Sequence, residues 1–227
     1  MVKIAFFIPV YNKALTIRET IQLLVTTATS MNLNFEIIAI DDASTDNSWS
    51  IINELKQGQV VQVHQNIANL GFAQTFFSCV AQTQAEFGMY ISADNDLHEN
   101  CLRSLLAEIG TSDVILQNCK NQNSRPAFRR IISKSYTWVL NQIYGLNLKY
   151  YNGFNIYPVE FLRKQNPAEK SFAFQAELVR KAVSLYSFKE VAINCGYNDD
   201  RTSAFKIKNI VGVAKFVLCQ LWDKKFG

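Results

Sequence analysis

Strand-like and helix-like segments alternate through the first half of the chain, and this alternation restricts the fold more than any other feature. Short apolar runs are separated by longer segments in which apolar residues recur three or four positions apart. The expected strands are 4–10, 35–40, 60–64, 89–92 and 114–117, and the expected helices are 14–29, 46–56, 72–86 and 99–109. This order predicts an α/β fold with a mostly parallel central sheet flanked by helices.

The second half of the 227 residues is less regular. We expect helices at 128–144 and 172–183, an extended segment at 150–157, a strand at 188–194 and a final amphipathic helix at 207–222. No linker, repeat or low-complexity segment separates these elements, so a single domain over residues 1–227 is predicted.

Composition narrows the class of protein. A net charge of +4 with 19% charged residues gives no reason to expect a nucleic-acid partner. No apolar run reaches the roughly 18 residues of a membrane-spanning helix, and the N-terminus does not resemble a signal peptide. The five cysteines are scattered without a CxxC pair, which favours neither a zinc site nor a disulfide framework. We therefore expect a reducing, cytoplasmic setting.

Polar clusters follow three of the expected strands. Tyr11-Asn12 follow the first strand, Asp41-Asp42 the second, and Asp94-Asn95-Asp96 the fourth. Alone, Asp41-Asp42 are as typical of a turn with a helix cap as of a binding site, and Asp94-Asn95-Asp96 are also typical of a turn that ends a strand. Open α/β sheets, however, bind ligands beyond the carboxyl ends of their strands, so three such loops predict one shared site.

Asp94 and Asp96 are candidate metal ligands. Carboxylates at positions i and i+2 of an extended segment point to the same side and would repel each other if unpaired. A hard cation, Mg²⁺ or Mn²⁺, resolves the repulsion and also binds diphosphate oxygens. His98 would add a nitrogen ligand and favour Mn²⁺, although a histidine after a strand is more often a polar surface residue.

Several segments together carry a family resemblance. In the first half they are 8–12 (IPVYN), 41–46 (DDASTD), 69–72 (NLGF) and 94–96 (DND); in the second half they are 151–157 (YNGFNIY), 174–177 (FQAE) and 190–193 (EVAI). On these segments the chain resembles the family 2 glycosyltransferases of the GT-A fold. Within that family it is most similar to the polyprenyl- or dolichol-phosphate sugar synthases.

The resemblance implies an inverting transfer of a sugar from a UDP- or GDP-sugar to a polyprenyl phosphate or other lipid-linked acceptor. The residues it implies for the nucleotide sugar are Pro9, Tyr11, Asn12, Asp41, Asp42, Gly71 and Asp94. It implies Asp94, Asp96 and His98 for the metal, and Arg129, Arg130 and Arg201 for an acceptor phosphate. The catalytic residues would be Asp94, Asp96 and Glu177. Residues 1–118 would then form the nucleotide-sugar half and 119–205 the acceptor half.

Three departures from the lipid-phosphate branch weaken the expectation of a lipid-phosphate acceptor. Basic residues of that branch are replaced by 117–119 (QNC), Asn155 and Ser203. An alternative is therefore transfer to a sugar hydroxyl in surface-polysaccharide or glycolipid synthesis, for which Glu177 is the candidate base. Another class, a non-catalytic nucleotide-sugar-binding or partner-binding module, is disfavoured by the intact aspartates. A dehydrogenase is disfavoured because no GxGxxG follows the first strand.

The C-terminal segment 206–227 suggests a peripheral contact with a membrane. Its expected helix combines an apolar face, Trp222 and several lysines, a pattern typical of helices that lie on anionic lipid. The site of action would then be the inner face of the cell membrane. The same helix is equally typical of one packed on the domain's own core or on a second copy in a homodimer.

Overall fold

The computed structural model of the chain describes residues 3–120, 127–165 and 174–193. The strands are β1 (Ile4–Val10), β2 (Phe35–Asp41), β3 (Val61–Gln65), β4 (Phe87–Tyr90), β5 (Val114–Cys119), β6 (Ile156–Pro158) and β7 (Phe188–Ile193). The helices are α1 (Ile17–Ser30), α2 (Ser48–Glu54), α3 (Phe72–Ala81), α4 (Glu99–Leu106), α5 (Ala127–Tyr144), α6 (Val159–Arg163) and α7 (Phe174–Leu185).

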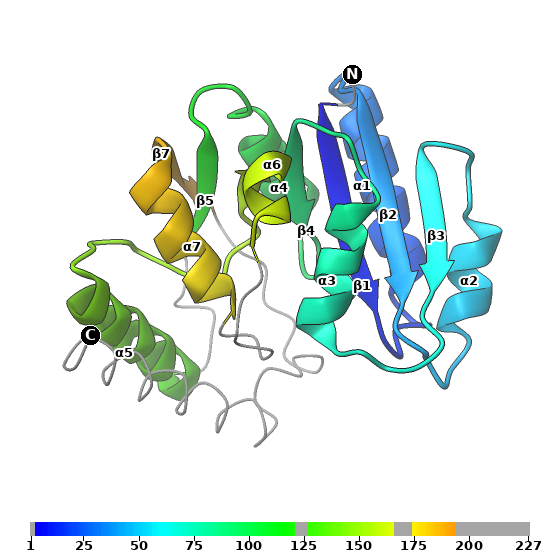
Figure 1. The fold of residues 1–227 in the computed structure, drawn as a ribbon, viewed down its shortest axis with the longest axis horizontal. Coiled ribbons are helices and arrows are strands. Elements are labelled where there is room, and N and C mark those ends of the chain that lie inside the picture. The colour runs from blue at the N-terminus through cyan, green and yellow to red at the C-terminus, as the bar shows by residue number, and fades with distance from the viewer. Residues whose placement is uncertain (1–2, 121–126, 166–173, 194–227) are drawn as a thin grey trace.

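The seven strands form one sheet in the order β3-β2-β1-β4-β6-β5-β7 (Figure 1). All neighbouring strands are parallel except β6, which runs antiparallel to both β4 and β5. The predicted mostly parallel α/β sheet is therefore confirmed. From β1 the chain builds outward to β2 and β3 on one side, then returns to place β4 on the other. This reversal makes the carboxyl ends of β1 and β4 a topological switch point, where such sheets bind ligands.

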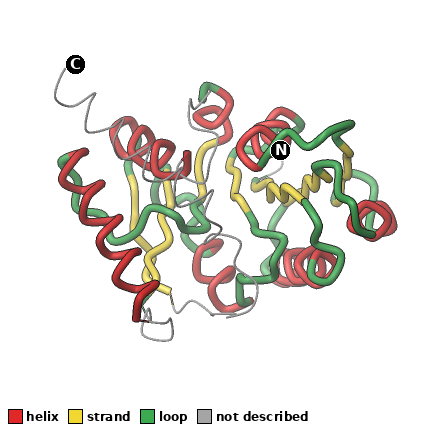
Figure 2. Tube along the Cα trace, turned by 90° about the horizontal axis from the view of Figure 1, so that it is seen from below, coloured by secondary structure: helices red, strands yellow, loops and turns green. Residues whose placement is uncertain are grey.

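Helices cover both faces of the sheet (Figure 2). The side chains of β1 show how the two layers are built. Ile4, Phe6 and Ile8 join one core cluster, whereas Ala5 and Phe7 join the other. Successive strand residues point to opposite faces, so a run buried on both sides reads as continuously apolar. The first cluster includes residues of α1, α2 and α4, and the second includes residues of α3, α5, α6 and α7.

Gly88 allows close packing in the second layer. A Cβ atom at this position would lie 2.4 Å from Cε2 of the fully buried Phe7 and 3.2 Å from Cγ2 of Val159. The space that a side chain would need is already filled, so glycine is required here for packing.

The element boundaries differ from the sequence expectation in several places. Strand β4 starts at Phe87, before the expected residue 89, because Phe87 pairs with Ile4. Helix α3 ends before the expected residue 86, because the Thr83 hydroxyl donates to Glu36 and accepts the N–H of Ala85. Such side-chain bonds to nearby backbone compete with helix. Helix α2 starts at Ser48 with Asn47 as its N-cap, later than expected.

The extended segment expected at 150–157 contains only the short β6, and the helix α6 after it was not predicted. Cys79 and Cys101 are free and buried. The predicted helix at 207–222 lies outside the described residues. None of the described helices has the length and hydropathy needed to cross a membrane.

Candidate functional site

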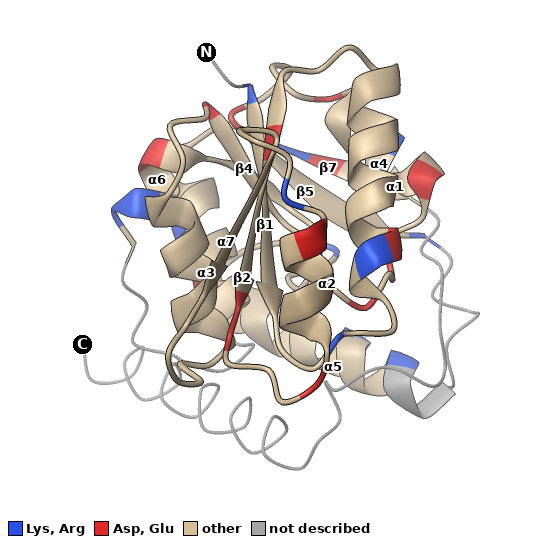
Figure 3. Ribbon diagram, turned by 90° about the vertical axis from the view of Figure 1, so that its right-hand side faces the viewer, with Lys and Arg blue, Asp and Glu red and all other residues tan. Residues whose placement is uncertain are grey.

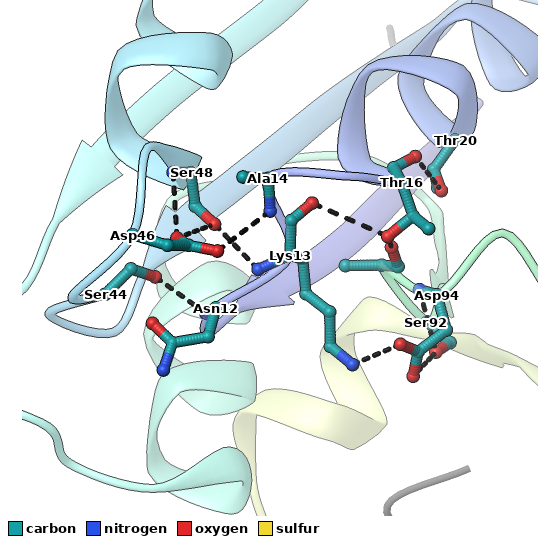
Figure 4. A network of polar contacts seen from close by, with 11 residues as sticks. Asn12, Lys13, Ala14, Thr16, Thr20, Ser44, Asp46, Ser48, Ser92 and Asp94 are labelled. Atoms are coloured by element: carbon teal, nitrogen blue, oxygen red, sulfur yellow. Dashed lines mark hydrogen bonds and ion pairs between the residues drawn. The ribbon is translucent and has the colours of Figure 1, made fainter. Parts of the chain in front are cut away.

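Three loops meet at the carboxyl ends of β1, β2 and β4, as the sequence predicted. Asn12 N–H donates to Ser44 Oγ at 2.9 Å, and Thr45 N–H donates to Asn12 Oδ1 at 2.8 Å. These bonds join the loop after β1 to the loop after β2. On the other side, Thr16 Oγ1 donates to the carbonyl of Ala93 at 2.6 Å, which joins the first loop to the loop after β4 (Figure 4).

Asp42 organises the chain leading into α3. Its Oδ1 accepts hydrogen bonds from Asn66 Nδ2 and Leu70 N, both at 2.8 Å, and its Oδ2 accepts one from Gly71 N at 2.9 Å. Gly71 is the N-cap of α3 and has a φ of +87°, a backbone conformation that residues with a side chain rarely adopt. Asp42 is only 3% exposed, so its charge is stabilised by these donors and by the nearby helix N-terminus. Asp42 was predicted to contact the nucleotide, but both of its carboxylate oxygens accept hydrogen bonds from the protein's own loop.

Asp41, the last residue of β2, has an unused acceptor. Its Oδ2 accepts hydrogen bonds from Ser44 N at 3.1 Å and Gln65 Nε2 at 3.2 Å. Its Oδ1 is buried and accepts no hydrogen bond from the described part of the chain. Buried polar atoms are normally paired, so a donor from a bound molecule would complete this carboxylate.

The chain turns at residues 93–94 and Asn95 has a positive φ, which corrects the extended geometry assumed from the sequence for 94–96. Asn95 has φ of +56°, in the left-handed region that asparagine tolerates better than most residues. Its amide donates to Glu19 Oε2 at 2.9 Å, which fixes the turn against α1. Asp94 receives a hydrogen bond from Ser92 Oγ at 3.2 Å and is ion-paired with Lys13.

The carboxylates of Asp94 and Asp96 both affect the pKa of the Tyr90 hydroxyl. Burial raises the pKa of the Tyr90 hydroxyl, a hydrogen bond with Ser92 lowers it, and the negative charges of Asp94 and Asp96 raise it further. The two carboxylates therefore lie close enough to one phenol to disfavour its ionised form. Two oxygen ligands on one turn suit a cation that completes its shell with substrate phosphates and water, as Mg²⁺ does. The residues present thus fit a divalent cation that arrives with a diphosphate.

His98 does not complete a metal site with the aspartates. Its side chain is exposed, and its carbonyl accepts the N–H groups of Cys101 and Leu102 as α4 begins. In residues 3–120, 127–165 and 174–193, no three His, Cys, Asp or Glu side chains gather as a ligand set. The three-ligand cluster expected from the sequence is therefore not formed.

Glu177 lies in the first turn of α7, where a negative charge favours the helix dipole. Its Oε1 lies 2.7 Å from Lys181 Nζ, and its side chain is 15% exposed. The start of α7 is fixed by Phe174, whose ring centroid lies 5.2 Å from that of Phe72 and 5.6 Å from that of Phe76. The start of α7, with Glu177, therefore packs beside the start of α3.

The two segments that lack the arginines of the lipid-phosphate branch, 117–119 and the one around Asn155, are joined to each other in the core. Gln117 N–H donates to Asn155 Oδ1 at 2.9 Å, and Phe154 N–H donates to Gln117 Oε1 at 2.5 Å. Asn155 Nδ2 donates to the Tyr157 hydroxyl at 3.0 Å. Gln117 is 5% exposed and Asn155 is 3% exposed. These polar side chains are thus used in joining β5 to β6.

The sequence profile described as glycosyl transferase family 2 matches residues 5–172, well over half of the chain. The chain belongs to this family. A poly(ribitol-phosphate) beta-glucosyltransferase of Bacillus spizizenii is 28% identical over 127 residues, which are 54% of this chain and 20% of that enzyme. The match therefore spans only a fifth of that relative's length.

Solved structures share the fold of this family 2 chain. S. aureus TarS 1-349 in complex with UDP has a TM-score of 0.65 and 21% identity, over 97% of this chain and 65% of that chain. Glucosyl-3-phosphoglycerate synthase from Mycobacterium tuberculosis, in complex with Mn²⁺, UDP-glucose and phosphoglyceric acid, has a TM-score of 0.68 and 13% identity, over 98% of this chain and 79% of that chain.

The structure gives only the position and exposure of the other residues that the sequence predicted for the donor and acceptor sites. Pro9 lies within β1 and is partly exposed, whereas the Tyr11 side chain is 46% exposed at the strand's carboxyl end. Arg130 is partly exposed near the start of α5. The side chain of Arg129 and all of Arg201 lie outside what the structure describes.

Sequence reasoning missed Lys13. Its backbone N–H donates to Ser48 Oγ at 2.7 Å, and its ammonium group contacts Asp94. The only signal was its position, directly after the polar pair Tyr11-Asn12 and therefore on the same loop.

Proposed function

We propose that the protein transfers a sugar from a UDP-sugar, with inversion, to a hydroxyl group of a surface-polysaccharide acceptor. Glycosyl transfer is the activity of the family. The choice of UDP is supported by the relatives crystallised with UDP or UDP-glucose. A polyol-phosphate polymer is supported as acceptor class by the name of the Bacillus relative.

The donor would lie across the three joined loops. Asp41 is fully buried, and its Oδ1 accepts no hydrogen bond from the described residues; this oxygen would accept an N–H of the base once the loops around it move to admit the donor. The exposed Tyr11 ring offers a face for stacking. Asp94 and Asp96 would hold Mg²⁺ or Mn²⁺ against the diphosphate. A bound cation would neutralise charge that develops on the leaving diphosphate.

The acceptor class rests mainly on the buried pair Gln117–Asn155. The lipid-phosphate branch has a basic residue in each of the two segments that contain Gln117 and Asn155, whereas here the Asn155 side chain accepts the Gln117 backbone N–H and donates to the Tyr157 hydroxyl. Neither Gln117 nor Asn155 carries charge, and both are nearly inaccessible. A phosphate acceptor would therefore lack two of the cations that the resemblance expects.

A hydroxyl acceptor requires a base, and Glu177 is suited to this role. Its carboxylate would take the hydroxyl proton as the acceptor oxygen bonds to the anomeric carbon and the bond to the diphosphate breaks. Lys181 holds the carboxylate in place before the acceptor arrives.

Release of UDP tests this proposal. We expect UDP-glucose or UDP-N-acetylglucosamine, with Mn²⁺, to be consumed faster when poly(ribitol phosphate) is added than when polyprenyl phosphate is added. Glu177→Gln should lower kcat by about 10²–10⁴-fold, the usual contribution of a general base. Glu160→Gln is the matched control, because Glu160 also pairs with a lysine one helical turn away, on the exposed face of α6. Stimulation by polyprenyl phosphate alone, with Glu177→Gln fully active, would refute the hydroxyl acceptor.

A lipid-linked acceptor at a membrane is the second candidate, and helix α5 favours it. Ile131 is 62% exposed and Trp138 is 64% exposed, on either side of the exposed Lys134. The helix sequence contains three basic residues and no Asp or Glu. Figure 3 shows basic colouring on the described part of α5. Exposed aromatic and aliphatic side chains beside lysine are typical of a helix lying on anionic lipid.

Flotation with liposomes tests this second candidate. Binding to anionic but not neutral vesicles, lost in Trp138→Ser and kept in Leu185→Ser, would support a membrane contact through α5. Leu185 is a suitable control, because it is 69% exposed on α7. Concentration-dependent dimerisation without flotation would show that a second copy covers α5 instead.

A further inference from the structure

The ion pair between Lys13 and Asp94 joins two of the three site loops across 81 positions of sequence. The Lys13 side chain is 24% exposed and that of Asp94 is 15% exposed, so the pair is mostly sheltered from water. By contrast, Lys3 and Glu86, at the opposite end of β1, are 38% and 50% exposed at a separation of 2.7 Å. Exposed pairs such as Lys3–Glu86 contribute little to stability, because water screens them. A pair sheltered from water, such as Lys13–Asp94, has a stronger effect on the charges around it.

The backbone around Lys13 is anchored, so its side chain starts from a fixed position (Figure 4). The Lys13 N–H donates to Ser48 Oγ at 2.7 Å, and the Ala14 N–H donates to Asp46 Oδ2 at 3.1 Å. The Lys13 carbonyl accepts the N–H groups of Thr16 and Ile17, both at 3.0 Å. The remaining freedom lies in the four-carbon side chain, which lets a lysine ammonium group move between partners.

The Asp94 carboxylate can either pair with Lys13 or bind a divalent cation. In the donor-free protein its carboxylate is neutralised by Lys13, while Asp96 lies two residues away. A divalent cation that binds Asp94 must displace the ammonium group or stay beside it, and both options are unfavourable without further negative charge. A diphosphate supplies that charge, because its oxygens can bind the cation and the displaced ammonium group together.

We infer that Lys13 is a built-in counter-ion of Asp94 that keeps the metal affinity low until the donor diphosphate arrives, and then turns to the diphosphate. This inference rests on the proposed function. It predicts that metal and nucleotide bind cooperatively, and thermodynamic linkage requires each to raise the affinity of the other by the same factor. Metal and donor would then enter the site together.

Replacement of Lys13 by methionine should reveal the competition. Without UDP, Lys13→Met should bind Mn²⁺ about tenfold more tightly than the wild type, a change within the usual range of coupling between two ligands. The factor by which UDP raises Mn²⁺ affinity should fall correspondingly. Lys13→Arg, which keeps the charge, should resemble the wild type, as should Lys3→Met, which removes the exposed ion pair at the other end of β1.

The measurement is the electron paramagnetic resonance signal of free Mn²⁺, titrated into the full-length protein with and without UDP. This reads out bound metal and needs no turnover. Equal or weaker Mn²⁺ binding by Lys13→Met, in a protein whose wild type binds Mn²⁺ and UDP cooperatively, would overturn the inference and leave the proposed function standing. A purely structural ion pair would give that result together with a lower Tm. A wild type that binds no UDP in the presence of Mn²⁺ would overturn both.

Discussion

Replacing Asp42 by alanine should destabilise the whole protein, because its carboxylate is an internal anchor. It accepts hydrogen bonds from Asn66 Nδ2, Leu70 N and Gly71 N at 2.8, 2.8 and 2.9 Å. In Asp42→Ala, two backbone N–H groups at the entry to α3 lose their acceptor. Burial at 3% exposure leaves little room for water to replace it.

The size of the effect follows from these bonds. A hydrogen bond to a charged group contributes about 1.5–3 kcal/mol, and an unpaired buried donor carries a similar penalty. The energies of three neighbouring hydrogen bonds do not simply add. Removing the buried charge of Asp42 also removes its desolvation penalty, which offsets part of the lost stability. We expect the free energy of unfolding to fall by roughly 3–5 kcal/mol. For a domain of this length that corresponds to a fall in Tm of about 10 °C.

Urea unfolding followed by circular dichroism measures this change directly. Asp113→Ala is the matched control, because Asp113 also accepts a backbone N–H, from Ser187 at 3.0 Å, but is exposed. We expect the control to lose much less stability, since water replaces the lost partner. If Asp42→Ala unfolds within about 1 kcal/mol of the wild type, the three bonds do not hold the loop and the reasoning is refuted.

Further expectations concern packing, pH and metal. Gly88→Ala should lower the free energy of unfolding by about 1–3 kcal/mol, because the added Cβ meets the Phe7 ring; an unchanged Tm would contradict this. Burial would raise the pKa of Asp46, but hydrogen bonds from Ser48 and from the backbone of Ala14 and Asp46 itself lower it on balance. Its stabilisation is therefore present above pH 3.8 and is lost as the pH falls through the lowered folded-state pKa. The stability difference between the wild type and Asp46→Asn, followed by urea unfolding, should accordingly disappear toward pH 2. Asp96→Ala should keep the wild-type Tm but lose the effect of Mn²⁺ on UDP affinity, which calorimetry with and without EDTA can show.

The parallel part of the fold was predictable because its signals are local. Each buried strand of the first half is a short apolar run, and each helix shows its own periodicity. Strand β6 was not predictable in the same way. It has three residues, and its place between β4 and β5 depends on pairing Ile156 with Met89 and Ile115, far away in sequence. Local patterns do not contain such pairings.

The site was predictable in outline but not in its division of roles. The strand-end positions of Asp41, Asp42 and Asp94 predicted that their loops would meet, and the hydrogen bonds between the loops confirm it. Asp41 and Asp42 are the same residue type at adjacent positions. Only the fold shows that one carboxylate holds the entry to α3 while the other keeps a buried oxygen unused. The partner of Asp94, Lys13, likewise becomes visible only when β1 and β4 are paired.

Calorimetric titration of UDP into the full-length protein, with Mn²⁺ and then with EDTA, tests the nucleotide-sugar site most directly. The account predicts one saturable site whose affinity falls sharply in EDTA. Asp41→Asn should weaken this binding about tenfold or more, because an amide presents a donor where the base N–H needs an acceptor. Glu160→Gln should leave it unchanged. The absence of saturable UDP binding in Mn²⁺, or binding that neither EDTA nor Asp41→Asn alters, would contradict the site described here.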